Sequence, residues 1–108
     1  MEKRAVERIP ANLSARFFYG NMFYTGTILN LSEKGMFIST RRCLPCESMF
    51  VIIIRSESKL MQVVARVKRL AKDNGHYGGM GVELLNATVE YSEFIGGLKE
   101  NKSFQASV

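Results

Sequence analysis

The sequence predicts a mostly β fold, a six-stranded antiparallel β-barrel with a short C-terminal α-helix. Six short segments rich in aromatic, β-branched and other apolar residues follow one another along most of the chain, with turn-forming residues between them. Closing these strands into a barrel removes the exposed edges of an open sheet, so closure is favoured. After the last segment, one helical face is predicted by the spacing of Tyr91, Phe94, Ile95 and Leu98.

The composition of each segment sets the expected strands and turns. Strands are expected at residues 12–19, 22–30, 35–40, 48–55, 59–70 and 77–85. Gly20-Asn21 is a two-residue hairpin signal, and Asp73-Asn-Gly75 marks another turn. The glycines within residues 77–85 indicate a bend, a bulge or a close approach of two backbones. The helix is then expected to start after Asn86, a favoured N-cap residue.

The length of 108 residues is that of one domain. Residues 1–11 are polar and charged and include Pro10, which disfavours regular structure, so they are expected to form a flexible N-terminal arm. Residues 12–98 are expected to form the barrel and its helix. A polar tail is expected at 99–108, because Gly96-Gly97 should weaken the end of the helix.

The composition is typical of a globular protein with a basic surface. The longest apolar run, residues 49–54, is far too short to span a bilayer. The sequence has no pattern typical of a secretion signal, and its two cysteines are too few for a disulfide scaffold, so a cytoplasmic location is expected. The formal net charge of +5 favours an anionic partner, whether a nucleotide, a nucleic acid or an acidic protein surface.

Two polar motifs carry most of the functional information. Arg4-Ala-Val-Glu-Arg8 can present two guanidinium groups to one ligand, and each matches the oxygens of a phosphate or the O6/N7 edge of guanine. In Asn30-Leu-Ser32 an amide and a hydroxyl at a strand end point the same way, so together they can read a base edge. Gly35 is expected to turn the chain through positive φ. These motifs predict a nucleotide receptor rather than an enzyme.

The order Arg-x-x-x-Arg and then Asp/Asn-x-Ser-x-x-Gly is similar to the signature of the PilZ domain, a bacterial receptor for the second messenger cyclic di-GMP. Arg8-Ile-Pro10 at the start of the first strand and Gly79-Met-Gly-Val-Glu-Leu84 in the last strand also resemble that family. The resemblance covers residues 4–98. The Arg-x-x-x-Arg motif alone is weak evidence, whereas both motifs in this order make the match specific.

The resemblance implies a cyclic di-GMP site made by Arg4, Arg8, Asn30, Ser32 and Gly35, with Lys3 as a further candidate. As the family implies, the arginines clamp phosphate and guanine, and at least one guanidinium also stacks on a base. Asn30 bonds the guanine edge, and Ser32 forms a hydrogen bond nearby. The residue at the position of Lys3 influences whether one ligand or a stacked pair is held, and the sequence leaves that stoichiometry open.

Signal transfer is expected to use the arm. Ligand binding should order the arm across the barrel face and so change a surface that a downstream partner protein contacts. Cyclic di-GMP is the expected ligand, and neither a separate cofactor nor a metal is expected. Membranes and nucleic acids are not the expected partners.

Two other functions remain open. Phe18, Tyr19, Phe23 and Tyr24 can serve as an aromatic platform for single-stranded nucleic acid, although such residues more typically form barrel core and cross-strand pairs. The chain can also be a structural member of the same family that acts through protein contacts without binding the nucleotide.

The remaining chemically reactive residues predict no catalysis. Cys43-Leu-Pro-Cys46 has the spacing of a redox motif or of half a zinc site, but a structural zinc needs four ligands and the only imidazole candidate is His76. The cysteines are therefore expected to be reduced and without a role, and His76 to be exposed. The chain has one aspartate, Asp73, and no Ser/His/Asp arrangement, so an enzyme is not expected.

Overall fold

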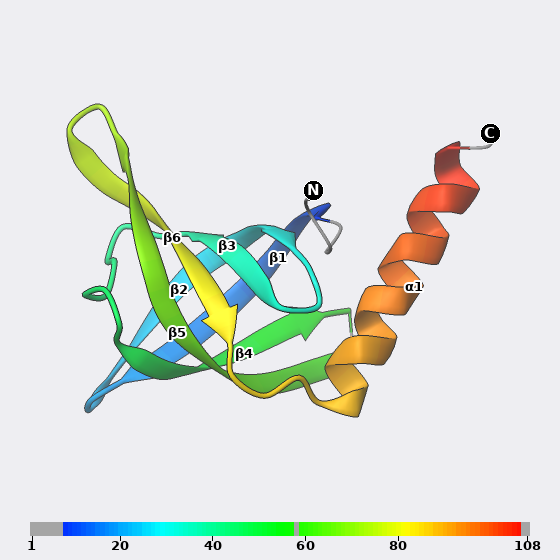
Figure 1. The fold of residues 1–108 in the computed structure, drawn as a ribbon, viewed down its shortest axis with the longest axis horizontal. Coiled ribbons are helices and arrows are strands. Elements are labelled where there is room, and N and C mark those ends of the chain that lie inside the picture. The colour runs from blue at the N-terminus through cyan, green and yellow to red at the C-terminus, as the bar shows by residue number, and fades with distance from the viewer. Residues whose placement is uncertain (1–7, 58, 107–108) are drawn as a thin grey trace, which may run out of the picture.

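The chain forms a closed six-stranded antiparallel barrel followed by one helix, as the computed structural model shows for residues 8–57 and 59–106 (Figure 1). The elements are β1 (Ile9–Tyr19), β2 (Met22–Leu31), β3 (Gly35–Ser39), β4 (Met49–Ser56), β5 (Lys59–Asp73), β6 (His76–Leu84) and α1 (Val89–Ala106). Around the barrel the strand order is β1-β2-β3-β6-β5-β4, and every neighbouring pair is antiparallel. The predicted fold class is confirmed.

The barrel interior is filled by alternate residues of the strands, as the period of a strand requires. Fully buried side chains come from all six strands and include Phe17, Ile28, Ile38, Ile52, Val63, Val67 and Met80. The helix contributes Tyr91 and Ile95, which are also fully buried, while Phe94 and Leu98 pack partly buried against the same core. The predicted apolar stripe of the helix is therefore the face that contacts the barrel.

The connections divide between two ends of the barrel (Figure 1). The β2–β3 loop and the start of β1 lie at the end that α1 covers. The β1–β2 hairpin, the β5–β6 hairpin and the β3–β4 connection lie at the other end. The described part of the chain contains no helix long and apolar enough to cross a membrane.

β1 begins at Ile9, so the expectation that Pro10 prevents regular structure is wrong. Pro10 lies opposite Asn30 of β2, next to an irregularity in the β1–β2 register between Pro10 and Leu13. A proline is tolerated there because such an irregularity interrupts the ladder that its missing N–H would otherwise join. Residues 1–7 of the expected arm lie outside the described residues.

The helix differs from expectation at both ends. It starts at Val89, and the Thr88 hydroxyl accepts a hydrogen bond from the Tyr91 amide at 3.1 Å, so Thr88 is the N-cap. The side-chain oxygen of Asn86 instead accepts from the Val64 amide of β5 at 3.0 Å. The helix continues to Ala106, into the segment expected to be a tail.

Candidate functional site

Arg8 and Asn30 meet on the outer face of the barrel. Arg8 directly precedes β1, and its Nη1 donates a hydrogen bond of 2.6 Å to Oδ1 of Asn30 near the end of β2. The guanidinium is exposed, and the amide is partly buried. The structure therefore brings together one arginine of the first motif and the first residue of the second motif, although they are far apart in the sequence.

A β-bulge turns Asn30 towards solvent. Between β2 and β3 the register shifts after Ile28, so that Leu29 is an extra residue on β2. Ile28 and Leu31 are fully buried, whereas the two residues between them leave the core. Strict alternation would direct Asn30 inward, so the bulge is what places its amide beside Arg8.

Ser32 organises the β2–β3 loop from inside. Its hydroxyl oxygen accepts hydrogen bonds from the amides of Lys34 at 3.3 Å and Gly35 at 3.2 Å, and it lies 3.3 Å from the Gly35 carbonyl, to which it donates. The Ser32 amide donates to the same carbonyl at 2.8 Å. Ser32 is only 4% exposed. Its hydroxyl therefore serves the turn, and it does not share with Asn30 an open edge as the sequence suggested.

Gly35 is required for a reason other than the expected one. Among the described glycines, positive φ occurs at Gly20 and Gly75, and not at Gly35. A Cβ on Gly35 would lie 2.6 Å from the Val82 carbonyl oxygen of β6, a distance that real Cβ atoms essentially never show. The glycine thus permits β3 to approach β6 at the point where the loop enters the barrel.

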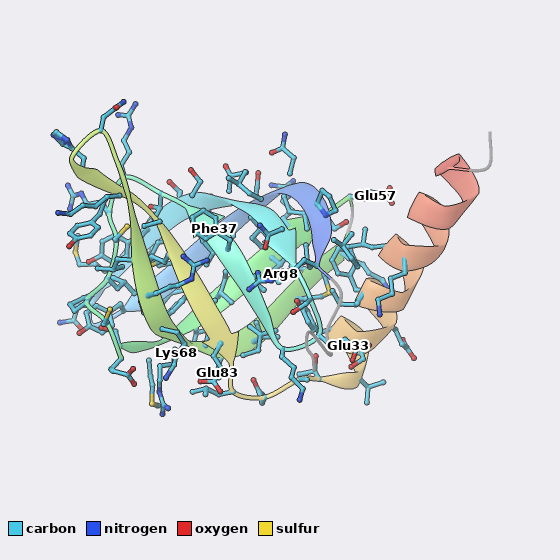
Figure 2. All side chains as sticks on the ribbon, turned by 45° about the horizontal axis from the view of Figure 1, so that its top comes forward. Arg8, Glu33, Phe37, Glu57, Lys68 and Glu83 are labelled. Carbon is cyan, nitrogen blue, oxygen red and sulfur yellow. The ribbon has the colours of Figure 1, made fainter. Side chains whose placement is uncertain are left out.

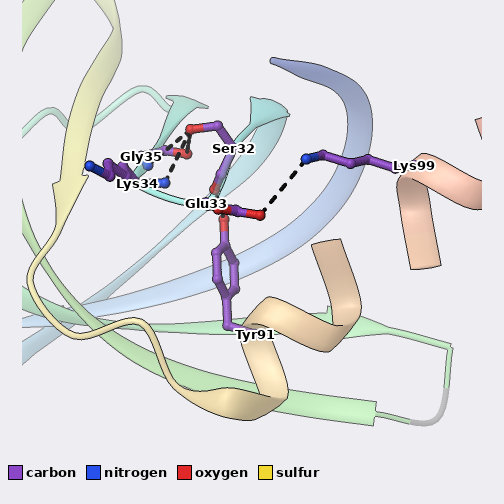
Figure 3. Close-up of polar contacts among 6 residues, drawn as sticks. All are labelled: Ser32, Glu33, Lys34, Gly35, Tyr91 and Lys99. Carbon is purple, nitrogen blue, oxygen red and sulfur yellow. Dashed lines mark hydrogen bonds and ion pairs between the residues drawn. The ribbon is translucent and has the colours of Figure 1, made fainter. Parts of the chain in front are cut away.

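Leu84, at the end of β6, and Tyr91 of α1 hold the loop from the other side, and Figure 3 shows Tyr91 beside it. The Tyr91 hydroxyl donates a buried hydrogen bond of 2.6 Å to the Ser32 carbonyl. The backbone amide of Leu84 donates to the Lys34 carbonyl at 2.9 Å. Each of these bonds satisfies a loop carbonyl that would otherwise lack a partner in the barrel wall. The conformation of the loop therefore depends on the C-terminal part of the fold.

The electrostatics around Tyr91 follow from its position. Burial raises the pKa of the Tyr91 hydroxyl well above its ordinary value; the nearby charge of Arg8 acts in the opposite direction, and that of Glu33 adds to the rise. Glu33 also lies 3.8 Å from Lys99 of the helix, an ion pair in which the Glu33 side chain is 57% exposed and the Lys99 side chain 37% exposed. Such exposed pairs contribute little stability, so the buried hydroxyl is the stronger link between helix and loop.

A row of outward-facing residues continues from Asn30 across the barrel wall, and no sequence motif indicated it. Asn30 of β2 lies opposite Phe37 of β3, Phe37 opposite Gly81 of β6, and Gly81 opposite Arg69 of β5. The Arg69 guanidinium lies 5.9 Å from the centre of the Phe37 ring. Figure 2 shows Phe37 on the same face as Arg8. These residues lie together because of the strand register, which could not be read from the sequence pattern.

The glycines of β6 make room for this row. A Cβ on Gly79 would collide with the Phe37 ring, and one on Gly81 would lie 3.1 Å from the Arg69 side chain. Of the bend, bulge or close backbone approach expected at these glycines, the structure shows irregularities in the β5–β6 register, whereas the atoms nearest to Gly79 and Gly81 belong to side chains. The register shifts twice along this stretch.

The two other predicted ligand-binding residues, Arg4 and Lys3, lie outside the described residues. Cys43 and Cys46 are free thiols, and the Cys43 thiol lies 3.5 Å from the Gly79 carbonyl, to which it donates. Burial raises the pKa of Cys43, which disfavours the reactive thiolate. Within the described ranges no group of three or more His, Cys, Asp or Glu side chains could hold a metal ion.

The aromatic residues considered as a platform divide between two environments. Phe18 and Phe23 form a cross-strand pair with ring centres 6.0 Å apart, but they are 40% and 56% exposed and so lie outside the core. Tyr24 stacks on the buried Phe17 at 5.4 Å. The expected cross-strand pairing is confirmed, while burial of all four residues in the core is not.

The geometry around Asn30 suits a planar, anionic ligand. An exposed guanidinium offers several N–H donors, the amide offers both a donor and an acceptor, and the Phe37 ring with Arg69 adds a flat surface next to them. No general base or nucleophile is placed among these residues. The arrangement can bind and orient a ligand by hydrogen bonds, charge and stacking.

The model of the PilZ domain family matches residues 2–98. No curated protein sequence matches the chain. Among solved structures, the chain is similar to the Bacillus subtilis inhibitor of motility, MotI/DgrA, with a TM-score of 0.78 and 16% identity over 94% of this chain and 52% of that one.

Two Escherichia coli structures are similarly close. The PilZ domain of YcgR with cyclic di-GMP has a TM-score of 0.77 and 14% identity, and the match covers 98% of both chains. YcgR in complex with cyclic di-GMP has a TM-score of 0.80 and 15% identity, covering 98% of this chain and 50% of that one. The chain thus spans about half the length of MotI/DgrA and of the longer YcgR chain. At these identities the likeness establishes a shared fold.

Proposed function

The chain belongs to the PilZ domain family, and from this premise we propose that it is a receptor that binds cyclic di-GMP and passes the signal to a partner protein. PilZ domains are ligand-binding receptors and adaptors rather than enzymes. The binding of cyclic di-GMP by YcgR, a structure with the same fold, supports this choice of ligand.

The observation that carries the proposal is the 2.6 Å contact between Arg8 and Asn30 on an open face of the barrel. Only one of the five guanidinium N–H groups is used in this contact, so the others can donate to a phosphate or to the O6/N7 edge of guanine. With its oxygen already bonded to Arg8, the Asn30 amide keeps its N–H donors and a second lone pair for a base. The pair is thus oriented before the ligand arrives.

Ser32 and Gly35 act through position rather than through direct contact with a base. Ser32 fixes the loop by its own hydrogen bonds, and Gly35 permits the close approach to Val82 that anchors the loop on β6. A rigid loop keeps the Asn30 amide at a constant distance from Arg8, which reduces the ordering cost of binding. This role differs from the base-reading role that the sequence suggested for Ser32.

The stacking surface in this proposal is the Phe37 ring and the Arg69 guanidinium above it. They occupy the next positions of the row that starts at Asn30. A guanine held by Arg8 and Asn30 would extend over this row, because neighbouring strands are only about 4.8 Å apart. Arg4 is proposed as a second clamp on the ligand, and Lys3 as the residue that influences whether one or two ligands are held.

Transmission is proposed to use the N-terminal arm. Arg8 stands at the junction of the arm and β1, so a ligand bound there contacts the arm and the barrel together. Ordering of the arm across the barrel would create or cover a surface for the partner.

Isothermal titration calorimetry of the chain with cyclic di-GMP tests the proposal. We expect micromolar or tighter affinity, which corresponds to about 8 kcal/mol, and amide shifts in NMR spectra at Arg8, Asn30 and Phe37. Parallel titrations with cyclic di-AMP and with a single-stranded oligonucleotide separate guanine recognition from general binding of anions. Absence of heat and of shift changes at millimolar cyclic di-GMP would refute the function.

A further inference from the structure

The end of the barrel remote from Arg8 and Asn30 contains an open cleft of about 1060 Å³. Its walls come from the β1–β2 hairpin, the start of the β3–β4 connection and the β5–β6 hairpin, which are all at the same end of the barrel in Figure 1. The proposed cyclic di-GMP site uses none of these segments. We call this hollow the end cleft.

The end cleft is basic. Arg41, Arg42 and His76 line it, and the Lys72 amino group lies 5.3 Å from the ring centre of Tyr77, another lining residue. None of the described lining residues is acidic. The one acidic residue of the β3–β4 connection, Glu47, pairs instead with Lys68 at 3.3 Å and Arg66 at 3.9 Å. No described acidic side chain forms an ion pair with either cleft arginine.

Large apolar side chains stand exposed in the same place. Met22 is 57% exposed, Phe23 56% and Tyr77 49%. Aromatic residues, methionine and arginine are the types enriched in protein–protein interfaces, and tyrosine and arginine in particular supply binding energy at their centres. An exposed methionine also adapts to the shape of a partner. The composition of the end cleft is therefore that of an interface.

Hydrogen bonds hold the arginine-bearing wall in place. The Thr40 hydroxyl donates to the Thr25 carbonyl of β2 at 2.9 Å and accepts from the Arg42 amide at 3.2 Å. The Thr40 amide donates to the Gly78 carbonyl of β6 at 3.1 Å. The backbone that carries Arg41 and Arg42 is thus tied to both neighbouring strands. Pre-organisation of this kind lowers the ordering cost of binding.

We propose that the end cleft docks an acidic segment of a partner protein, with carboxylates at Arg41 and Arg42 and an apolar or aromatic side chain between Phe23 and Tyr77. Charge complementarity identifies the partner as acidic, and the exposed Met22, Phe23 and Tyr77 require apolar side chains beside the carboxylates. A single-stranded nucleic acid instead needs a basic groove that follows its backbone over several nucleotides. Here the basic side chains Arg41, Arg42 and His76 are grouped in one hollow at the end of the barrel and do not form an extended groove.

The end cleft and the Arg8–Asn30 pair can be occupied at the same time. The part of β2 that lines the cleft ends at Gly26, and the four residues from there to Asn30 span roughly 13 Å along the strand. The two sites also share no residue. The proposed docking therefore does not depend on cyclic di-GMP binding.

Titration of the ¹⁵N-labelled full chain with three short synthetic peptides tests the proposal. The first alternates Glu with Phe and Leu, the second keeps the Glu residues but replaces Phe and Leu with Ser, and the third keeps Phe and Leu but replaces Glu with Lys. We expect the first peptide to shift the amides of Phe23, Arg42 and Tyr77 and to bind about tenfold more tightly than the second. The third peptide should not bind, and added salt should weaken the first.

Charge reversal locates the site. The double variant R41E/R42E should weaken the first peptide at least about tenfold, while R55E, at an exposed arginine of a neighbouring hollow, should leave its affinity unchanged. Thermal unfolding of both variants verifies that they are folded.

Three results would overturn the proposal. One is the absence of binding by the first peptide at millimolar concentration. Another is an equal loss of affinity in R41E/R42E and R55E. The third is tighter binding of oligo(dT) than of the peptide at the same amides, which would assign the end cleft to nucleic acid instead.

Discussion

Replacing Tyr91 with phenylalanine removes a single hydroxyl, and we expect it to lower both the stability of the fold and the affinity of the proposed ligand site. The hydroxyl donates to the Ser32 carbonyl at 2.6 Å in a fully buried position, so the Y91F variant leaves that carbonyl without its partner. An unsatisfied buried acceptor costs about 1–3 kcal/mol. For a domain of this size that corresponds to a fall in Tm of roughly 4–8 °C for each kcal/mol.

The same variant should change the response to alkali. The folded-state pKa of Tyr91 is raised by burial above the unfolded value of 10.0, so the folded state retains a proton that the unfolded state loses. The stability that this hydroxyl contributes is therefore complete below pH 10 and is lost as the pH rises from there towards the folded-state pKa. Y91F should consequently lose less stability than the wild type above pH 10.

Differential scanning fluorimetry across a range of pH measures both the fall in Tm and its dependence on alkali. Calorimetry with cyclic di-GMP should give an affinity about three- to tenfold weaker for Y91F, because the loop is less ordered. The matched control is Y19F, which removes the hydroxyl of a partly exposed tyrosine and should change neither Tm nor affinity. If Y91F unfolds within about 1 °C of the wild type at neutral pH, the assigned cost of the unpaired carbonyl is wrong.

Four further substitutions, with Gly96→Ala as a control, test the proposed ligand site and the loop that supports it. Arg8→Ala should weaken cyclic di-GMP binding by roughly one to two orders of magnitude in calorimetry, because it removes a charge-assisted contact, and an unchanged Kd would exclude Arg8 from the site. Asn30→Ala should reduce the preference for cyclic di-GMP over cyclic di-AMP, whereas Arg4→Ala should weaken both ligands alike; retention of full guanine preference in the Asn30 variant would place selectivity elsewhere. Gly35→Ala should lower the free energy of unfolding in urea by about 1–3 kcal/mol, because its Cβ would press on a β6 carbonyl. The control Gly96→Ala, in open space on the helix, should raise that free energy. Equal effects of the two substitutions would contradict the packing argument.

Most of the barrel could be predicted from the sequence, because strand composition and turn residues are local signals. Five of the six strands begin within a residue of the predicted positions, and the hairpin at Gly20-Asn21 occurs where expected. The start of β1 was missed because a proline is a local signal against regular structure, whereas the bulge that accommodates Pro10 depends on pairing with β2. Likewise, Asn86 is a good N-cap by type, but the Val64 amide of β5 takes its side chain, and Thr88 caps the helix.

The sequence was sufficient to predict residues of the candidate site, but not how they are arranged in space. The motifs brought out Arg8 and Asn30, which the structure places in contact. The burial of Ser32 and the contact of its carbonyl with Tyr91 depend on tertiary packing across the barrel. Phe37 enters the row beside Asn30 through strand register, which periodicity alone does not fix.

The hydrogen bond from Tyr91 to Ser32 also sets the order in which the protein becomes competent during synthesis. The two residues are 59 positions apart, and the amide of Leu84, which holds the same loop, also comes late in the chain. Contacts of such long separation form only after both segments have left the ribosome and closed a long loop. A nascent chain that already includes Arg8, Asn30 and Ser32 therefore still lacks the end of β6 and α1, which hold the β2–β3 loop in place. The loop around Ser32 would then become rigid only when α1 docks, and under the proposed function a half-made chain would not compete with finished molecules for cyclic di-GMP.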